Sequence, residues 1–141
     1  MIALHWDEVE RDKNSVALDV DWVSYRRAEK DGQFRAIEMT KKGQLIGYNG
    51  FFVHHSWHFK GLMTAICDVV YVAPDARGMA GVKLLKDSEK LIATLAPMVK
   101  IFYHSKPYVH IGAKSGTLGQ LLGHLGYRHD EDVLTKIVRA R

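Results

Sequence analysis

The sequence predicts a mixed α/β fold of the α+β kind, with a largely antiparallel central sheet flanked by helices. Two observations carry this prediction. A hairpin-like pattern of apolar residues fills residues 33–59, and an apolar strand at 62–73 leads through a glycine-containing loop into an amphipathic helix. The chain has 141 residues, of which 47% are hydrophobic. That size and composition predict one domain over residues 1–141.

The first part of the chain predicts two helices followed by the hairpin. Helices are expected near residues 5–12 and 20–30, because apolar residues recur at helical spacing in the second segment and a glycine follows it. The hairpin strands are expected at residues 33–40 and 45–59, joined by a glycine turn. Two glycines inside the second strand predict a bulge or a close backbone approach: Gly47 and Gly50.

The later part predicts a strand, a helix, another strand and a short helix. Residues 62–73 are apolar on both faces except for Asp68, as expected for an inner strand of a sheet. The next helix has an apolar stripe, formed by Val82, Leu85, Ser88, Leu91 or Ile92, and Leu95. The remaining elements are a strand at 98–104, a short helix within 114–127 that ends at Gly126, and a last strand or hairpin at 127–138.

Charge and cysteine content exclude several classes of protein. The single cysteine, Cys67, cannot form an internal disulfide and is expected to be a small buried hydrophobe. The net charge of +4 is scattered along the chain, which disfavours a nucleic-acid partner and suits a small polyanion. The first residues lack the apolar region of a secretory signal, and no apolar run approaches the roughly 20 residues of a membrane span. We therefore expect a soluble cytoplasmic protein without a membrane partner.

The stretch from Cys67 to Leu91 joins a strand to a helix through a short basic loop. Gly78 and Gly81 remove side chains where the backbone turns into the helix. The N–H groups of the first helical turn, with the helix dipole, then form an anion site. Arg77 and Lys83 would add mobile positive charge beside it. In the alternative interpretation the glycines only make a tight turn and the arginine is solvated.

Three segments resemble the GCN5-related N-acetyltransferase (GNAT) superfamily. "VYVAPDARGMAGVKLL" resembles its strand, pyrophosphate loop and helix, and "SGTLGQLLGHLGYRHDEDVLTK" resembles its late helix and last strand. The upstream "GQLIGYNGFFVHHSWH" resembles the branch that tailed phages often encode. The resemblance covers nearly the whole chain. It implies a GNAT-like fold, acetyl-CoA as donor, and a small-molecule or peptide amine as acceptor. It also implies the host cytoplasm as location if the protein is phage-encoded, and it is compatible with a homodimer.

The resemblance also implies which residues bind the donor. The strand backbone at Tyr71 and Val72 would hold the pantetheine arm, and Ser115 would contact CoA where the family often has an asparagine. The loop N–H groups would hold the pyrophosphate, and they belong to Arg77, Gly78, Met79, Ala80, Gly81 and Val82. The loop departs by one position from the family's glycine spacing. We expect a slightly shifted loop, because a valine at a small position would crowd a phosphate.

Asp68 is the leading candidate for the general base. It is the one charge in an apolar strand, where burial would raise its pKa, and some members of the family have a catalytic glutamate on this strand. In the alternative it lies at an edge or makes a structural hydrogen bond or ion pair. Tyr103 and His104 lie beside the expected cleft and are the other catalytic candidates. The family's usual acid, a tyrosine on the late helix, is Leu122 here, so another group protonates the thiolate or turnover is weak.

The histidines near residue 55 raise the question of a metal. His54 and His58 would share one face of a strand, but no cysteine or nearby acid completes a zinc ligand set, so no metal is expected. One alternative is a wall of the acceptor site. The other is a strand end with an amphipathic packing face, formed by Val53, His55, Trp57 and Phe59.

We therefore expect an acetyl-CoA-dependent N-acetyltransferase in which a primary amine attacks the thioester directly. The alternative is a binding or structural protein with this fold and weak or absent turnover, such as a phage particle or host-interaction component. A small basic nucleic-acid binder is the third interpretation, and the scattered charge argues against it.

Overall fold

The computed structural model describes residues 1–10, 16–104 and 118–130. The chain divides into two compact units, Met1–Tyr103 and His104–Arg141, and each is considered by itself. The single domain over residues 1–141 stays a prediction. Among the described residues, no helix is long and apolar enough to cross a membrane.

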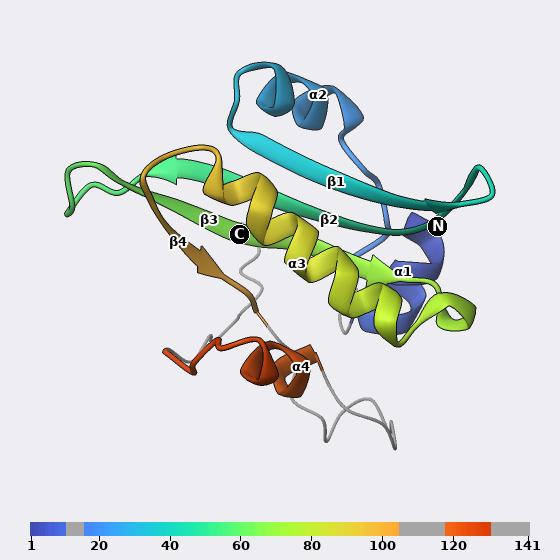
Figure 1. Cartoon of the computed structure of the whole chain (residues 1–141). Helices are drawn as coiled ribbons and strands as arrows, with labels where there is room; N and C mark the ends of the chain where they lie inside the picture. Colours follow the sequence, from blue (N-terminus) through green and yellow to red (C-terminus); the bar gives the residue numbers. More distant parts are fainter. Residues whose placement is uncertain (11–15, 105–117, 131–141) are drawn as a thin grey trace. The chain divides into compact units, whose positions relative to one another are not determined.

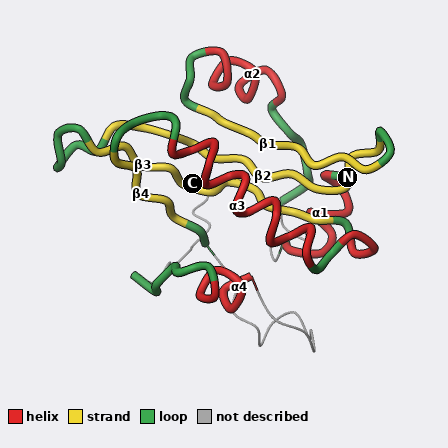
Figure 2. Tube along the Cα trace, in the orientation of Figure 1, coloured by secondary structure: helices red, strands yellow, loops and turns green. Residues whose placement is uncertain are grey.

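The first unit is built on a four-stranded sheet in the order β1-β2-β3-β4 (Figure 1). Its strands are β1 (Phe34–Lys41), β2 (Gln44–His55), β3 (Leu62–Val72) and β4 (Met98–Phe102). The first three strands pair antiparallel, and β4 pairs parallel with β3. The predicted fold class is confirmed, and so is the inner position of β3 (Figure 2).

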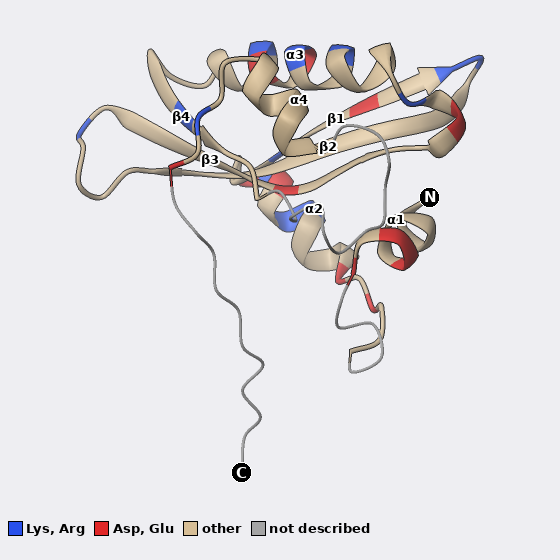
Figure 3. Ribbon diagram, turned by 90° about the horizontal axis from the view of Figure 1, so that it is seen from below, with Lys and Arg blue, Asp and Glu red and all other residues tan. Residues whose placement is uncertain are grey.

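Helices cover both faces of this sheet. Helix α3 (Met79–Ala93) lies on one face, whereas α1 (Ile2–Val9) and α2 (Trp22–Lys30) lie on the other (Figure 3). The predicted helix at 20–30 is confirmed, while α1 begins and ends about one turn earlier than predicted. Helix α2 begins where the Asp21 carboxylate accepts a hydrogen bond from the Ser24 backbone N–H at 3.0 Å, as N-cap aspartates do.

The face under α3 holds the buried core. Phe51, Val53, Ala65, Cys67 and Ile92 form its central cluster. The buried stripe of α3 consists of Leu84, Leu85, Ser88 and Ile92. This stripe confirms the predicted helical period, although the period did not single out Leu84. The prediction for Cys67 is also confirmed, and burial raises the pKa of its thiol to about 12.

The two glycines of β2 sit where other chain segments approach closely. A Cβ added at Gly50 would lie 2.6 Å from Cζ of Phe34, and one at Gly47 would lie 3.0 Å from the carbonyl oxygen of Tyr71. The pairing of β2 with β3 changes register next to Gly50. The predicted bulge and close approach are therefore confirmed.

The end of β2 differs from the prediction. The strand stops at His55, because the Ser56 N–H donates to the Leu62 carbonyl and the chain turns there. Trp57 is 95% exposed, and Phe59 is exposed as well. The predicted amphipathic packing face at residues 53–59 is therefore wrong beyond the strand end.

The second unit contains α4 (Leu118–His124). Gly126 follows it with φ +92°, and the N–H groups of Gly126 and Tyr127 donate to the carbonyls of Gly123 and Leu122. This is the paired hydrogen bonding of a glycine C-terminal cap, so the predicted helix end is confirmed. In the first unit β4 is shorter than predicted and stops at Phe102. The predicted last strand lies mainly outside the described residues.

Candidate functional site

Strands β3 and β4 part in the middle of the sheet. They pair from Leu62 with Met98 to Ile66 with Phe102, where β4 ends. Strand β3 continues to Val72, still paired with β2 on its other side. Alternate residues of this last stretch turn their N–H and C=O groups away from β2. Within the described part of the first unit, no strand pairs with that edge, so it can bind an extended ligand through backbone hydrogen bonds.

A β-bulge marks the point where the strands part. The β2–β3 register passes from Gly50 opposite Val69 to Phe51 opposite Cys67, which leaves Asp68 without a partner. Bulges re-aim side chains and recur beside active sites. Asp68 is exposed, so its predicted burial is wrong. The physical reason is that the bulge turns this side chain onto the α2 face of the sheet.

Tyr25 of α2 holds the Asp68 carboxylate. Its hydroxyl donates to Oδ2 of Asp68 at 2.5 Å. Burial raises the pKa of Tyr25, and the hydrogen bond to Asp68 raises that pKa further, so the phenol stays protonated at neutral pH. In the part of the chain that the structure describes, Oδ1 of Asp68 accepts no hydrogen bond. The structural hydrogen bond considered for Asp68 exists, but its donor is a tyrosine and not a basic side chain.

Tyr25 belongs to a group of four rings on this face, the aromatic platform: Trp22, Tyr25, Phe34 and Phe52. The Tyr25 ring centroid lies 5.1 Å from that of Phe34 and 5.9 Å from that of Phe52. Trp22 lies 6.2 Å from Tyr25. Phe34 is buried, whereas Trp22 is 52% exposed and Phe52 is 38% exposed. The platform therefore offers aromatic surface beside the bulge. Sequence spacing could pair Trp22 with Tyr25 on one helix, but not with the two phenylalanines of the strands.

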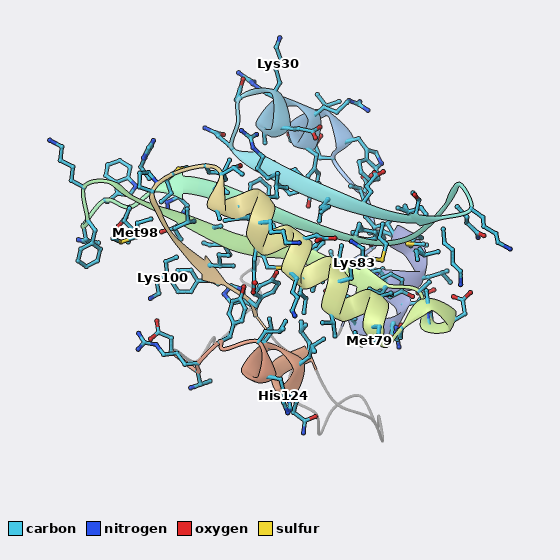
Figure 4. The ribbon with its side chains drawn as sticks, viewed as in Figure 1. Lys30, Met79, Lys83, Met98, Lys100 and His124 are labelled. Carbon is cyan, nitrogen blue, oxygen red and sulfur yellow. The ribbon has the colours of Figure 1, made fainter. Side chains whose placement is uncertain are left out.

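The loop after β3 leads into the N-terminus of α3. Gly78 is the N-cap, with φ +94° and open space around the position of a Cβ. The N–H groups of Met79 and Ala80 have no partner within the helix, because they belong to its first turn. The Gly81 N–H donates to the Gly78 carbonyl at 3.0 Å. Met79 and Lys83 project from this end of α3 (Figure 4). The open backbone and the helix dipole favour an anion here.

The predicted mobile charge beside this loop is wrong, because both cations have partners. Nη2 of Arg77 lies 2.6 Å from each carboxylate oxygen of Glu8 on α1, and Nε donates to the Val72 carbonyl at 3.1 Å. Lys83 is paired with Asp87 one turn further along α3. The alternative interpretation is partly right, because Arg77 is exposed as well as paired with Glu8. The prediction of an anion site then depends on the backbone N–H groups of the loop.

Ring contacts and a hydrogen bond close to Arg77 hold helix α1 against the end of β3. The His5 ring stacks on the Tyr71 ring at 4.9 Å, and its Nδ1 is hydrogen-bonded to the Tyr48 hydroxyl at 2.8 Å. The guanidinium carbon of Arg77 lies 5.8 Å from the centroid of the Tyr71 ring. Since the Tyr71 side chain is buried in these contacts, only its backbone is placed to serve the edge of β3.

Tyr103 lies on the opposite face of the sheet from Asp68. Its hydroxyl accepts a hydrogen bond from Nδ2 of Asn49 at 2.9 Å, and the same amide nitrogen donates to Oγ of Ser88 on α3 at 3.0 Å. Burial raises the pKa of Tyr103, against a lowering effect of the Asn49 bond. His104 is exposed and begins the second unit. The structure therefore brings Asp68 to Tyr25 and does not bring it to Tyr103.

Asn49 is the residue that the sequence reasoning missed. It is fully buried, and Sγ of Cys67 donates to its Oδ1 at 3.4 Å. Its amide thus links β2, β3, α3 and the residue after β4. The available signal was an amide inside an otherwise apolar strand, since buried amides need several hydrogen-bond partners.

The remaining predicted positions lie outside the described residues, in the second unit, or near the end of β2. Ser115 lies outside the described residues, and Leu122 lies in α4 of the second unit. His54 and His55 end β2, but His58 is beyond the strand, so the shared face predicted for His54 and His58 is wrong. The described residues contain no group of three metal-ligating side chains.

An apolar hollow near Phe59, Leu62 and Met98 lies at the other end of β3 from the bulge. Six residues of strand, at about 3.3 Å each, separate Leu62 from Asp68, or about 20 Å. The hollow is therefore not part of the site at the bulge.

Solved acetyltransferases match the chain in fold. An aminoglycoside acetyltransferase from an uncultured soil metagenomic sample, in complex with sisomicin, has a TM-score of 0.68 at 10% identity, over 99% of this chain and 86% of its own. A ribosomal-protein-alanine N-acetyltransferase from Brucella melitensis biovar Abortus 2308 has a TM-score of 0.60 at 19% identity, over 99% and 86%. A GNAT family acetyltransferase from Staphylococcus aureus has a TM-score of 0.61 at 15% identity, over 97% and 90%.

These similarities show the fold. No protein-family model matches the sequence, and no curated protein matches it significantly. The expected GNAT-like fold is confirmed. The resemblance to a phage-encoded branch, the donor, the acceptor and a homodimer stay predictions.

Proposed function

We propose that the chain is an acetyl-CoA-dependent N-acetyltransferase whose reaction centre lies at the Asp68 bulge. The observation that carries the proposal is the coincidence of this bulge with the parting of β3 and β4. This coincidence places an exposed carboxylate beside an edge of β3, and the loop after β3 leads to the N-terminus of α3. Similarity to solved acetyltransferases supports the same function.

The donor fits the backbone of the first unit. The pantetheine arm is an extended chain with amide groups, and it would lie towards Val72 along the edge of β3 with which no described strand of the first unit pairs. The pyrophosphate would then meet the first turn of α3, where Gly78, Met79 and Ala80 present N–H groups without a side-chain cap. No acidic residue lies in this first turn.

The acceptor amine would approach from the α2 face, beside Asp68. An ammonium ion first loses a proton, which Asp68 accepts through a water molecule because an aspartate is short. The nitrogen then attacks the thioester carbonyl carbon, so that a C–N bond forms and the C–S bond breaks. The thiolate takes up one proton and the new amide nitrogen loses another. The balance is one ammonium and one thioester in, and one amide, one thiol and one proton out.

Tyr103 is the proton donor that we assign to the thiolate. It directly follows β4, where the strands part. It would replace the tyrosine that the family carries at the position of Leu122. Replacement of Tyr103 by Phe should lower kcat and leave the affinity for acetyl-CoA unchanged.

A second candidate function is a binding protein that keeps the fold without turnover. The observation that favours it is Leu122 at the position of the usual acid. Pairing of Arg77 with Glu8 points the same way, because it leaves less positive charge for a pyrophosphate.

Thermal unfolding with acetyl-CoA tests the donor site. A ligand present at 100 times its Kd should stabilise the chain by about 2.7 kcal/mol. Ala80→Glu should abolish this stabilisation, since it adds a negative charge to the first turn of α3 while remaining favourable to the helix itself. Gln44→Glu, the same charge change at an exposed residue of β2, is the matched control.

Release of free thiol in the presence of amines tests the chemistry. Asp68→Asn should keep acetyl-CoA binding and lose most of the transfer rate, because the amide still accepts from Tyr25 but does not take up a proton. Absence of stabilisation at millimolar acetyl-CoA would contradict the proposed enzyme. Stabilisation without transfer to any of a panel of amines would favour the second.

A further inference from the structure

We propose that the acceptor is a primary amine with a single positive charge on a compact apolar body, bound on the aromatic platform beside Asp68. This inference rests on the proposed acetyl transfer, and it specifies the acceptor class of that same site. Three features of the α2 face carry it: exposed aromatic surface, a carboxylate held at its edge, and positive charge along α2.

The first feature is apolar surface that the fold leaves uncovered. Trp22 and Phe52 of the platform are exposed, and so are Val23 beside Trp22 and Leu18 in the segment before α2. Single exposed apolar side chains are ordinary on proteins, but a group of them marks a binding site. The neighbouring Phe51 is fully buried on the other face of the sheet. The fold therefore buries one of these two phenylalanines and leaves Phe52 exposed.

The second feature is the position of the charge. Tyr25 contacts Phe34 and Phe52 through its ring and Asp68 through its hydroxyl. The carboxylate therefore lies at the edge of the aromatic surface, at the hydroxyl end of Tyr25. Ring faces attract cations, and a carboxylate adds a direct ionic partner. An amine cation at Asp68 would thus place its carbon body over the rings of the platform.

The third feature limits the number of charges that the acceptor carries. The exposed side chains of α2 include Arg26, Arg27 and Lys30 against Glu29, and Arg27 lies 3.9 Å from the carboxylate of Asp31, which directly follows the helix. The carboxylate of Asp21 is engaged by both the N–H and the hydroxyl of Ser24. A polyamine or an aminoglycoside, which carries several ammonium groups, would meet repulsion from Arg26 and Lys30. A singly charged apolar amine needs only Asp68 and the rings.

Acetyl transfer to a panel of amines tests the inference. The panel contains 2-phenylethylamine, hexylamine, spermidine, an aminoglycoside and a short peptide with a free N-terminus. We expect kcat/KM for the first two to exceed that for spermidine and the aminoglycoside by at least about tenfold, the factor that corresponds to one good cation–π contact. Preference for the polycations or for the peptide would overturn the inference and leave the proposed function standing.

Trp22→Ala is the matching variant, and Trp57→Ala is its control. Both remove an exposed tryptophan, but Trp57 lies beyond the end of β2 and outside the platform. Trp22→Ala should raise KM for 2-phenylethylamine about tenfold, with little change in kcat or in acetyl-CoA affinity. Trp57→Ala should change none of these. Equal effects of the two variants, or no effect of Trp22→Ala, would contradict the inference.

Direct binding separates this inference from the proposed function. Ligand-observed NMR of 2-phenylethylamine, with and without Trp22, needs no turnover. The chain could bind 2-phenylethylamine, with weaker binding in Trp22→Ala, and yet neither bind acetyl-CoA nor transfer acetyl groups. That outcome would support amine binding at the platform and contradict the proposed function. Absence of binding to the wild-type chain, with and without acetyl-CoA, would overturn the inference itself.

Discussion

The two faces of the sheet are built differently. Under α3 the side chains are apolar and closed off from water, and the one buried amide, Asn49, is hydrogen-bonded to Ser88 and Tyr103. Under α2 the contacts are ring against ring, two of the four rings are exposed, and the bulge adds a carboxylate. The difference indicates that the α3 face carries most of the stability. The α2 face can then keep a reactive surface that better packing would close.

Phe51 and Phe52 show this division in adjacent residues. Successive side chains of a strand point to opposite faces, so the two phenylalanines lie on different sides of the same sheet. Phe51 is 0% exposed and makes an edge contact with Tyr103 at 5.6 Å. Phe52 is 38% exposed and contacts Tyr25 and Phe34. Substitutions at these two positions can therefore separate stability from function.

The largest expected effect comes from Phe51→Ala. Truncation of a fully buried phenylalanine removes its transfer free energy and leaves a cavity, so we expect a loss of about 3–5 kcal/mol in the free energy of unfolding. Urea unfolding followed by circular dichroism measures it. Phe52→Ala should cost less than half as much and should instead raise KM for the acceptor. Equal losses of stability would break the division between the faces.

Asn49→Ala has the next largest expected effect on stability. It removes the donor shared by Ser88 and Tyr103 and the acceptor of the Cys67 thiol, in a site closed to water. We expect a loss of about 2–3 kcal/mol in the free energy of unfolding, the cost of unsatisfied buried polar groups together with a small cavity. Asn49→Leu refills the cavity without restoring the hydrogen bonds, so the difference between the two variants separates these causes. A loss below about 1 kcal/mol for Asn49→Ala would contradict a structural role for the network.

Gly50→Ala tests a position that affects the α2 face. Its Cβ would lie 2.6 Å from Cζ of Phe34, which is packed against Tyr25 and Phe52. Overpacking of this kind costs about 1–3 kcal/mol, and we expect the lower half of that range because the platform is partly open. The displaced Phe34 should also weaken acceptor binding. Gly50→Ala with Phe34→Leu should recover stability, and failure to do so would place the strain elsewhere.

The sequence predicted the α3 face better than the α2 face. Helical period identified the buried stripe of α3, and the apolar run of β3 identified the inner strand, because both signals come from neighbouring residues on one element. Glycines at 47 and 50 predicted close approach for the same local reason. The glycine loop before α3 was predicted from local signals too, whereas the role of the β3 backbone was implied only by the family resemblance.

The side-chain part of the site could not be predicted locally. The bulge at Asp68 depends on the register of two strands, so the sequence led to a buried carboxylate where the structure has an exposed one. Tyr25 and Asp68 are 43 positions apart, and Arg77 meets Glu8 across 69 positions. No spacing rule links such residues. Burial of Asn49 likewise follows from the packing of α3 across β2. The pattern of apolar residues within β2 carries no information about that packing.

The smallest expected effect concerns Asp21, the N-cap residue at which α2 begins. Hydrogen bonds from the hydroxyl and the backbone N–H of Ser24 lower the pKa of Asp21 below its ordinary value. The folded state therefore favours the charged carboxylate. Its contribution to stability is present above the pKa of the unfolded chain and is lost as the pH falls through the lower pKa of the folded chain. Asp21→Ala should lower the melting temperature slightly at pH 7, with less difference from the wild type near pH 2.

Asp21→Asn is the control for that pH dependence, since asparagine caps helices about as well without a titrating group. It should keep most of the stability at pH 7 and remove the part that acid removes from the wild type. Because Trp22 and Tyr25 lie in the first turn of α2, Asp21→Ala should also raise KM for an apolar amine more than Asp21→Asn does. A change of stability in Asp21→Ala without that change of KM would show that the platform does not depend on where α2 begins. The α2 face would then be stabilised by its ring contacts alone.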